Sequence, residues 1–368
     1  MTLATAPEQT ATAASGSYET LVQRAIAQHT GRTDRYRVTV PEYVSFRTQG
    51  FLVVPGLLTA AEVGELRQHT EDLMQGRLPE QRGQLACDAQ GRPLVKSGVD
   101  VQELEAPPAN LTPEQKAEFW LRIHMLHYKL ELHERYLLQP RVLDVLEALI
   151  GPDVLALQSM LFLKGPGKPG QGYHQDSYYI PTFPDTLCGA WIAIDDVDEE
   201  NGCMWFTPGS HNEPVYPPQD GYGFGDDRLE GIAHIRGVSE TDESKNDLTK
   251  VAAKYAGREI CAPMKAGDVA FFGGHVLHRS HTNRSKNRFR RSFVGHYCNA
   301  RSYTNWGKDW ATSVVDPVTG STNGSHILAR GDTHLAFSRP RFGTPCAALL
   351  PQELRQEKPT GQSSMMGA

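Results

Sequence analysis

The feature that most constrains the fold is a series of short strand-like runs in the second half of the chain. They are rich in β-branched and aromatic residues and are separated by Gly, Pro, Asn and Asp. The runs cover residues 155–163, 187–194, 203–206, 259–262, 269–272 and 289–298. No crossover helices are predicted between them, which disfavours a doubly wound parallel sheet. The pattern predicts a mainly β domain with flanking helices, a jelly roll of the cupin-like, double-stranded β-helix kind.

The first half of the chain has the apolar spacing of helices. Thr59 is a candidate N-cap for a helix that runs to residue 74. A stretch from 112 to 138 is predicted as a second helix, and a third follows Pro140 with apolar residues at i, i+3 and i+4. We expect these helices to pack on the sheet.

We expect one folded domain with a long polar insertion at residues 212–257. An insertion of this length inside a compact domain is typical of a lid or of disorder, and we interpret it as a lid over substrate. The predicted parts are a disordered tail 1–16, a single domain 17–368 with helical support 17–153, a jelly-roll core 154–300 with the insertion 212–257, and a C-terminal wrap 301–368.

Composition narrows the class of protein. There are 37 basic and 43 acidic residues, a formal net charge of −6, so no general affinity for nucleic acid or anionic lipid is expected. No apolar run approaches the roughly 20 residues that span a bilayer, and no secretory signal is recognisable, so we expect a cytoplasmic protein. The six cysteines show no Cys-x-x-Cys spacing and are interpreted as small buried hydrophobes.

A candidate metal site begins with His174 and Asp176. Side chains two residues apart on an extended chain project from the same side, so both can reach one metal ion. A third ligand is then needed, and an apolar run downstream contains His275 and ends in His278. Two histidines and one carboxylate on one face of a metal form the facial triad of non-haem Fe(II) oxygenases.

Several motifs together resemble the phytanoyl-CoA dioxygenase family of iron(II)- and 2-oxoglutarate-dependent oxygenases. They are the strand, acidic turn and strand of 191–211, the Lys164-Gly165-Pro166-Gly167 segment ahead of His174, and the ending Leu277-His278-Arg279-Ser280. The resemblance runs from about residue 43 to about residue 297, with the motifs in the family's order.

The resemblance implies a jelly roll in which His174, Asp176 and His278 hold Fe(II), with 2-oxoglutarate and O2 as co-substrates. The family's His-x-Ser ending favours His278 over His275 as the distal ligand, since the two would point to opposite faces of a strand. His281 is a weaker alternative.

The resemblance also implies residues for the co-substrate. Its far carboxylate is bound by an arginine about a dozen residues after the distal histidine, and the end of the strand favours Arg290 over Arg291, which is then expected at the surface. In the same way Ser280 is expected to supplement the arginine, Gln158 to donate to the co-substrate and Trp191 to form a wall of the pocket.

The implied reaction is hydroxylation of an unactivated C–H bond of a small molecule, with conversion of 2-oxoglutarate to succinate and CO2. Related halogenases replace the carboxylate ligand by a small residue, so Asp176 favours hydroxylation, while desaturation, epimerisation, ring formation and endoperoxide formation stay open as alternatives. Two alternatives keep the jelly roll: a non-catalytic ligand-binding protein, and a metal-dependent hydrolase or isomerase that does not use 2-oxoglutarate. Loss of activity on replacing Arg290 would separate the oxygenase from the hydrolase or isomerase.

Overall fold

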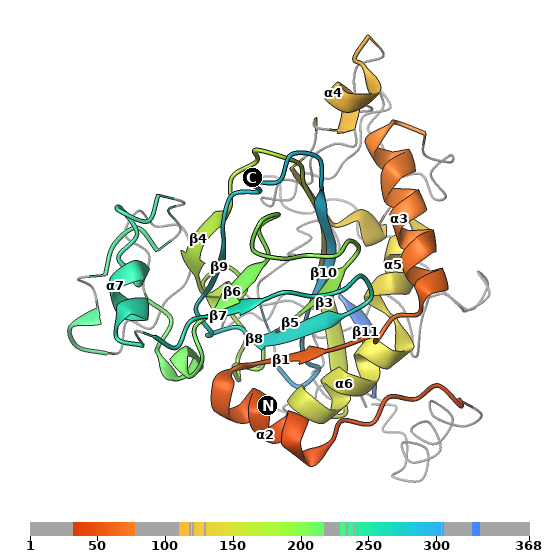
Figure 1. Cartoon of the computed structure of the whole chain (residues 1–368). Coiled ribbons are helices and arrows are strands. Elements are labelled where there is room, and N and C mark those ends of the chain that lie inside the picture. The colour runs from red at the N-terminus through yellow and green to blue at the C-terminus, as the bar shows by residue number, and fades with distance from the viewer. Residues whose placement is uncertain are drawn as a thin grey trace, which may run out of the picture.

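Two antiparallel sheets form the centre of the molecule (Figure 1), which confirms the predicted jelly roll. The computed structural model describes residues 32–77, 110–117, 119, 121–128, 130–216, 229–232, 235–238, 240, 242–255, 257–302, 304 and 326–331. The larger sheet contains β1 (Phe51–Val54), β8 (Val269–Gly273), β5 (Cys188–Ala193), β10 (Arg290–Asn299), β3 (Val154–Lys164) and β11 (Ile327–Arg330) in that order, with β2 (Arg122–His124) paired to β3. The smaller sheet contains β4 (Gln171–His174), β9 (His278–Ser280), β6 (Met204–Phe206) and β7 (Ile260–Ala262).

Helices cover the outer face of the larger sheet (Figure 1). These helices are α2 (Val40–Gln49), α3 (Ala60–Met74), α5 (Glu131–Leu137) and α6 (Pro140–Ile150). The described chain also contains α4 (Pro113–Ala117), α7 (Leu248–Ala253) and the short 3-10 turns η1 (Leu126–Tyr128), η2 (Asp176–Tyr178) and η3 (Ser210–Asn212). Thr59 caps α3 as predicted, in a reciprocal capping box with Glu62. None of the helices in the described ranges has the length and hydrophobicity of a membrane-spanning segment.

The helix predicted over 112–138 is wrong. In its place the chain forms α4, β2, η1 and α5. Ile123 is buried opposite Leu161 of β3, and Met125 has a φ of 60°, a left-handed conformation that no helix interior accepts. Pairing with β3 therefore overrides the helical propensity of this stretch.

Side chains of the larger sheet alternate between two cores because successive residues of a strand face opposite ways. Phe293 and Ile192 pack against α3, α5 and α6, whereas Val294 and Trp191 pack against the smaller sheet inside the barrel. The barrel interior is thus largely apolar, and the polar side chains that it contains stand out against that background.

The described cysteines carry free thiols, in agreement with the prediction. Cys188, Cys203 and Cys298 are buried, and Cys261 is half-buried. The thiols of Cys203 and Cys261 lie 3.1 Å apart on the smaller-sheet side of the barrel. The remaining two cysteines, at positions 87 and 346, lie outside the described residues.

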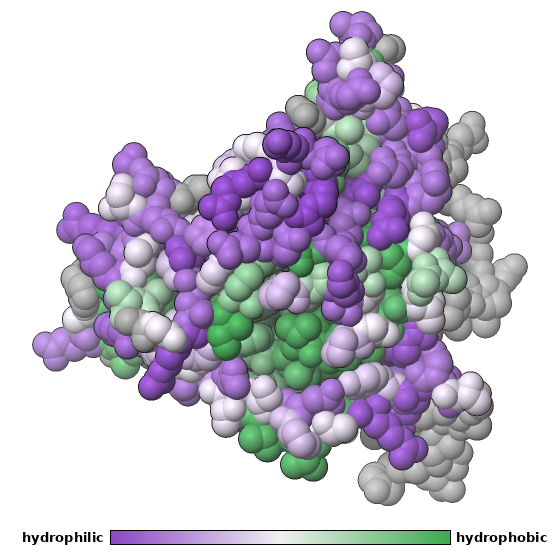
Figure 2. All heavy atoms as spheres, in the orientation of Figure 1, coloured by the Kyte–Doolittle hydropathy of each residue, from purple (hydrophilic) through white to green (hydrophobic). Residues whose placement is uncertain are grey.

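The described part of the insertion packs on the outer face of the smaller sheet. Leu248 and Val251 of α7 are buried with Tyr173 of β4 and with Leu277. Asn246 fastens the segment further by donating to the carbonyl of Tyr173 at 2.7 Å. The helix contacts the sheet by one apolar side only, because Lys250, Ala253 and Lys254 on its other side are exposed. Figure 2 shows a mixed polar and weakly apolar surface in this region. Its role as a lid stays a prediction.

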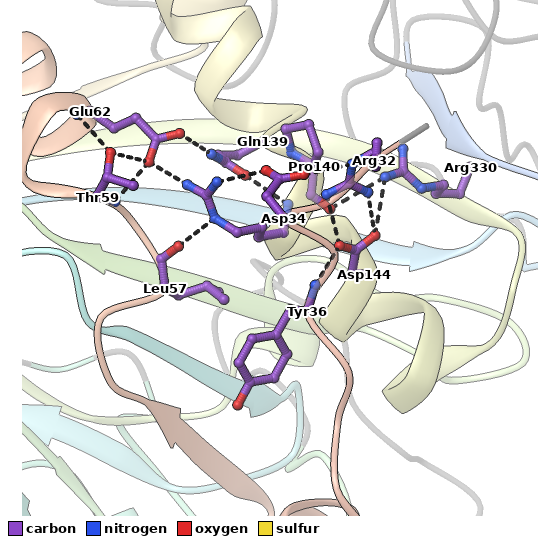
Figure 3. A network of polar contacts seen from close by, with 11 residues as sticks. Arg32, Asp34, Tyr36, Leu57, Thr59, Glu62, Gln139, Pro140, Asp144 and Arg330 are labelled. Carbon is purple, nitrogen blue, oxygen red and sulfur yellow. Dashed lines mark hydrogen bonds and ion pairs between the residues drawn. The ribbon is translucent and has the colours of Figure 1, made fainter. Parts of the chain in front are cut away.

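A buried carboxylate on α6 joins two distant parts of the chain (Figure 3). Both oxygens of Asp144 accept from Arg32, at 2.7 and 2.9 Å, and one also accepts from the backbone N–H of Tyr36 at 3.0 Å. Arg330 of β11 lies 3.5 Å from the same carboxylate. Asp144 therefore holds the beginning of the described chain and the C-terminal strand against one helix.

Candidate metal centre

Three side chains from neighbouring strand ends meet inside the barrel. His174 ends β4, Asp176 begins η2 and His278 begins β9, where it lies opposite His174 in register. Asp176 Oδ1 is 3.7 Å from Nε2 of each histidine, and the three ligand atoms lie within 4.8 Å of one another. The residues are only 7%, 8% and 4% exposed. This arrangement is the predicted His-Asp-His set.

Backbone carbonyls fix the orientation of both imidazoles. Nδ1 of His174 lies 2.9 Å from the carbonyl oxygen of Gly172, and Nδ1 of His278 lies 3.0 Å from that of Val276. Each Nδ1–H therefore donates to a carbonyl and leaves the lone pair of Nε2 for a metal. Burial, together with the nearby His278, lowers the pKa of His174 to about 3, so this imidazole is neutral. The donor set fits a ferrous ion.

The second oxygen of Asp176 is held by a residue that the sequence did not indicate. His296 of β10 lies with Nε2 2.9 Å from Asp176 Oδ2 and with Nδ1 2.9 Å from Gln158 Nε2. Since the Gln158 amide donates to Nδ1, the proton resides on Nε2 and is donated to Asp176. Burial opposes ionisation of Asp176, but His278 and His296 outweigh it and hold the pKa of the carboxyl well below its usual range. Oδ1 is thereby left to the metal.

Replacing His296 by leucine is expected to weaken ferrous ion binding about 10- to 100-fold, because the carboxylate loses the donor that orients it. His296→Gln, whose amide can still donate, should lose less. Anaerobic titration of metal-free protein with Fe(II) measures both affinities. A leucine variant that binds Fe(II) as tightly as the wild type would contradict this role.

The two adjacent arginines of β10 lie in different environments. Arg290 points into the barrel, donating to Ser280 Oγ at 3.3 Å and to the carbonyl of Gly202 at 3.1 Å. Arg291 points outward, where it pairs with both oxygens of Asp195 and with Glu71. Arg291 is only 7% exposed, so the expectation that it lies at the surface is wrong: its two acidic partners cover it.

The remaining predicted co-substrate residues divide between two places. Trp191 lies beside Arg290, with the guanidinium carbon 5.6 Å from the centre of its ring, and Ser280 accepts from that guanidinium. Gln158 lies instead against His296, and its buried amide oxygen has no hydrogen-bond partner among the residues that the structure describes. The structure thus brings Arg290, Ser280 and Trp191 together and places Gln158 beside the carboxylate ligand.

The two competing histidines lie away from the triad. His275 bonds through Nδ1 to the carbonyl of Glu213 at 2.8 Å and pairs through Nε2 with Asp185. The ring of His281 packs edge-on against Trp205 at 5.4 Å. Among the described residues, the triad is the only cluster of three or more metal-ligating side chains.

A second residue whose role the sequence did not indicate is Lys164, at the end of β3. It is 2% exposed and lies directly opposite Arg290 in the register of β3 and β10. The available signal was a lone lysine that ends a strand whose other residues, apart from Gln158 and Ser159, are apolar. For His296 the signal was its even spacing from Arg290, which places both side chains on one face of the strand.

Comparison with known proteins agrees with this geometry. The family model described as Phytanoyl-CoA dioxygenase (PhyH) matches residues 46–292. The chain is 28% identical over 273 residues to phytanoyl-CoA dioxygenase domain-containing protein 1 of Danio rerio, covering 67% of this chain and 86% of that protein. It is 25% identical over 275 residues to the peroxisomal phytanoyl-CoA dioxygenase of Homo sapiens, covering 73% and 70%.

A solved structure supports the fold. The non-heme monooxygenase ThoJ in its apo form superposes with a TM-score of 0.51 at 19% identity, covering 83% of this chain and 91% of that chain. The family match spans about two thirds of the chain and includes all three residues of the triad. The chain therefore belongs to the phytanoyl-CoA dioxygenase (PhyH) family of iron- and 2-oxoglutarate-dependent oxygenases.

Proposed function

We propose that this oxygenase hydroxylates an unactivated C–H bond of a small-molecule substrate while 2-oxoglutarate is converted to succinate and CO2. The observation that carries the proposal is the intact carboxylate of Asp176, set between His174 and His278 with one oxygen free for iron. A protein that only binds a ligand has no need of this buried, oriented donor set. When bound, iron and the 2-oxo acid supply the oxidising chemistry, in which one oxygen atom of O2 enters succinate and the other enters the product.

The surroundings of Arg290 support its assignment to the far carboxylate of the co-substrate. Its guanidinium is buried, and no carboxylate of the described residues lies within ion-pair distance. Burial lowers the pKa of Arg290 to about 10, which leaves it charged at neutral pH. A buried cation without an acidic partner is costly unless an anion joins it. Ser280 and Trp191 complete the surroundings of this charge.

The substrate class follows from the family and from charge. The curated relatives are named for phytanoyl-CoA, a thioester whose phosphates need basic side chains. The insertion between strands, 212–257, is acidic on balance and provides no basic groove in its sequence. We therefore favour a free small molecule over a CoA thioester.

The proposal is tested by anaerobic addition of Fe(II) and then 2-oxoglutarate to metal-free protein. A 2-oxo acid that chelates ferrous iron gives a weak visible charge-transfer band, and its appearance would justify a substrate screen by succinate release. Correctly folded wild-type protein that gives no band would overturn the proposal and favour a non-catalytic binding protein or a hydrolytic metal site.

Replacing Arg290 by leucine is expected to weaken 2-oxoglutarate binding about 10- to 100-fold with little change in Fe(II) affinity, because the arginine contacts none of the three metal-ligating side chains. Titration of the charge-transfer band measures the change. Arg288→Leu is a matched control, since Arg288 pairs with Asp198 and Glu200 at the protein surface. Equal 2-oxoglutarate affinity in the wild type and the Arg290 variant would exclude the assigned role.

A further inference from the structure

Two buried basic side chains face each other across β3 and β10. Lys164 and Arg290 are direct register partners on β3 and β10, and they are 2% and 4% exposed. Like charges opposite one another on neighbouring strands repel, and burial strengthens the repulsion. No carboxylate of the described residues acts on either side chain. The described part of the chain therefore supplies no anion to balance the charge of Arg290, and the pair is suited to bind one.

The protonation state of Lys164 depends on the charge of its neighbours, and none of the titratable groups around it is negative. Arg290 lies on one side, and the thiol of Cys203 lies ahead of β6. Burial and the contact with Cys261 raise the pKa of Cys203, which keeps the thiol neutral. From the loop after β9, His281 offers only its carbonyl to Lys164 and turns its ring to Trp205. Burial, aided by Arg290, lowers the pKa of Lys164 to about 6.

Three oxygen atoms surround the amino group of Lys164. Nζ lies 3.2 Å from the carbonyl of Gly202, 2.6 Å from the carbonyl of His281 and 3.0 Å from Ser280 Oγ. Gly202 has a φ of 81°, and a Cβ there would lie 2.9 Å from Nζ and 2.5 Å from the His281 carbonyl. Only glycine lets the chain approach the amine in this way.

This set of partners fits a neutral amine fully and an ammonium after one change. A neutral amine donates its two hydrogens to the two carbonyls and accepts the hydroxyl hydrogen of Ser280, whose two lone pairs accept from Arg290 and from the backbone N–H of Gln171. An ammonium donates to all three oxygens, so the hydroxyl hydrogen of Ser280 is released and one of the other two donors to Ser280 Oγ must leave it. The side chain of Arg290, at 3.3 Å, is the donor that can turn away, and its N–H and the hydroxyl hydrogen are then both available to an anion that enters beside them.

We propose that Lys164 takes up one proton from solvent when the far carboxylate of a dicarboxylic 2-oxo acid enters beside Arg290, and that this proton turns the Ser280 hydroxyl toward the carboxylate. This inference rests on the proposed function and deepens it. Lys164 is a positioning residue, since it acts through Ser280 and through its charge. It makes the protein select a dicarboxylic 2-oxo acid over a monocarboxylic one, and it couples that selection to pH.

The test is anaerobic calorimetry of the Fe(II)-loaded protein at pH 7.5 in two buffers of different ionisation enthalpy. With 2-oxoglutarate, the difference in heat should report uptake of close to one proton per site, because Lys164 is largely neutral beforehand. With 2-oxobutyrate, which offers the same chelating group but no far carboxylate, the uptake from Lys164 should be absent. As pH rises from 7 to 8.5, the affinity for 2-oxoglutarate should fall by up to about tenfold per pH unit, whereas the affinity for 2-oxobutyrate should not show this fall.

Lys164→Met should abolish the excess proton uptake and weaken 2-oxoglutarate binding about 10- to 100-fold, while binding of 2-oxobutyrate stays unchanged. Lys168→Met, four residues further on in the loop that follows β3, is the matched control and should behave as the wild type. If wild-type protein fails to bind 2-oxoglutarate, the proposed function fails. If it binds 2-oxoglutarate and 2-oxobutyrate with equal proton uptake, the role of Lys164 is wrong, and this comparison needs no variant.

Discussion

Replacing Asp176 by alanine is expected to lower Fe(II) affinity more than about 100-fold and to reduce turnover to the level of a protein-free control. Loss of a residue that only orients a metal ligand already costs about 10- to 100-fold in affinity, and Asp176 is the ligand itself. It is also the single negative charge of the site, so without it two neutral imidazoles face a divalent ion in a buried position. Anaerobic Fe(II) titration and succinate release measure the two effects.

The asparagine variant distinguishes loss of the charged metal ligand from a change in the size of the side chain. Asp176→Asn keeps the size of the side chain and an oxygen that can accept from His296, but it removes the charge. It should lose nearly as much metal affinity as the alanine variant while unfolding at a similar temperature to the wild type. If either variant bound Fe(II) as the wild type does, Asp176 would not be a ligand, and the assignment of the triad would be wrong.

The long strands of the larger sheet were predictable because both of their faces are buried. β3 and β10 appear in the sequence as runs of ten or so residues rich in aliphatic or aromatic side chains, and their predicted limits differ from the observed ones by one residue at each end. The strands that carry the metal ligands gave no comparable signal. β4 is four residues long and β9 three, and their sequences, Gln-Gly-Tyr-His and His-Arg-Ser, show no apolar alternation. They are strands because longer neighbours pair with them.

The candidate site shows the same division. His174 and Asp176 were found from their spacing, and the choice of His278 came from a resemblance to a family. The roles of Lys164 and His296 depend on how β3 and β10 pair. In the observed register Lys164 lies opposite Arg290, and His296 lies opposite Gln158. Register is a property of the assembled sheet, and a shift beside His296 alters it further, so one strand's sequence could not reveal these pairs.

Outside the barrel, the largest expected effect on stability belongs to Asp144. Asp144→Ala should lower the free energy of unfolding by about 3–5 kcal/mol, because it removes the fully buried carboxylate that pairs with Arg32 and Arg330. Arg32 would lose both of its hydrogen bonds to α6 (Figure 3). Arg330 would keep a contact with Glu147 at 3.9 Å. Denaturant unfolding of the wild type and the variant measures the difference.

Asp34 provides the control because it contacts the same Arg32 from the surface. Its side chain is 49% exposed, and it pairs with Arg32 at 3.3 Å and with Arg141 at 2.8 Å. Ion pairs of this kind contribute about 1 kcal/mol or less, so Asp34→Ala should leave stability nearly unchanged. Equal losses in the two variants would mean that burial adds nothing to the network, and that Asp144 does not hold the first described residues and β11 to the helical layer.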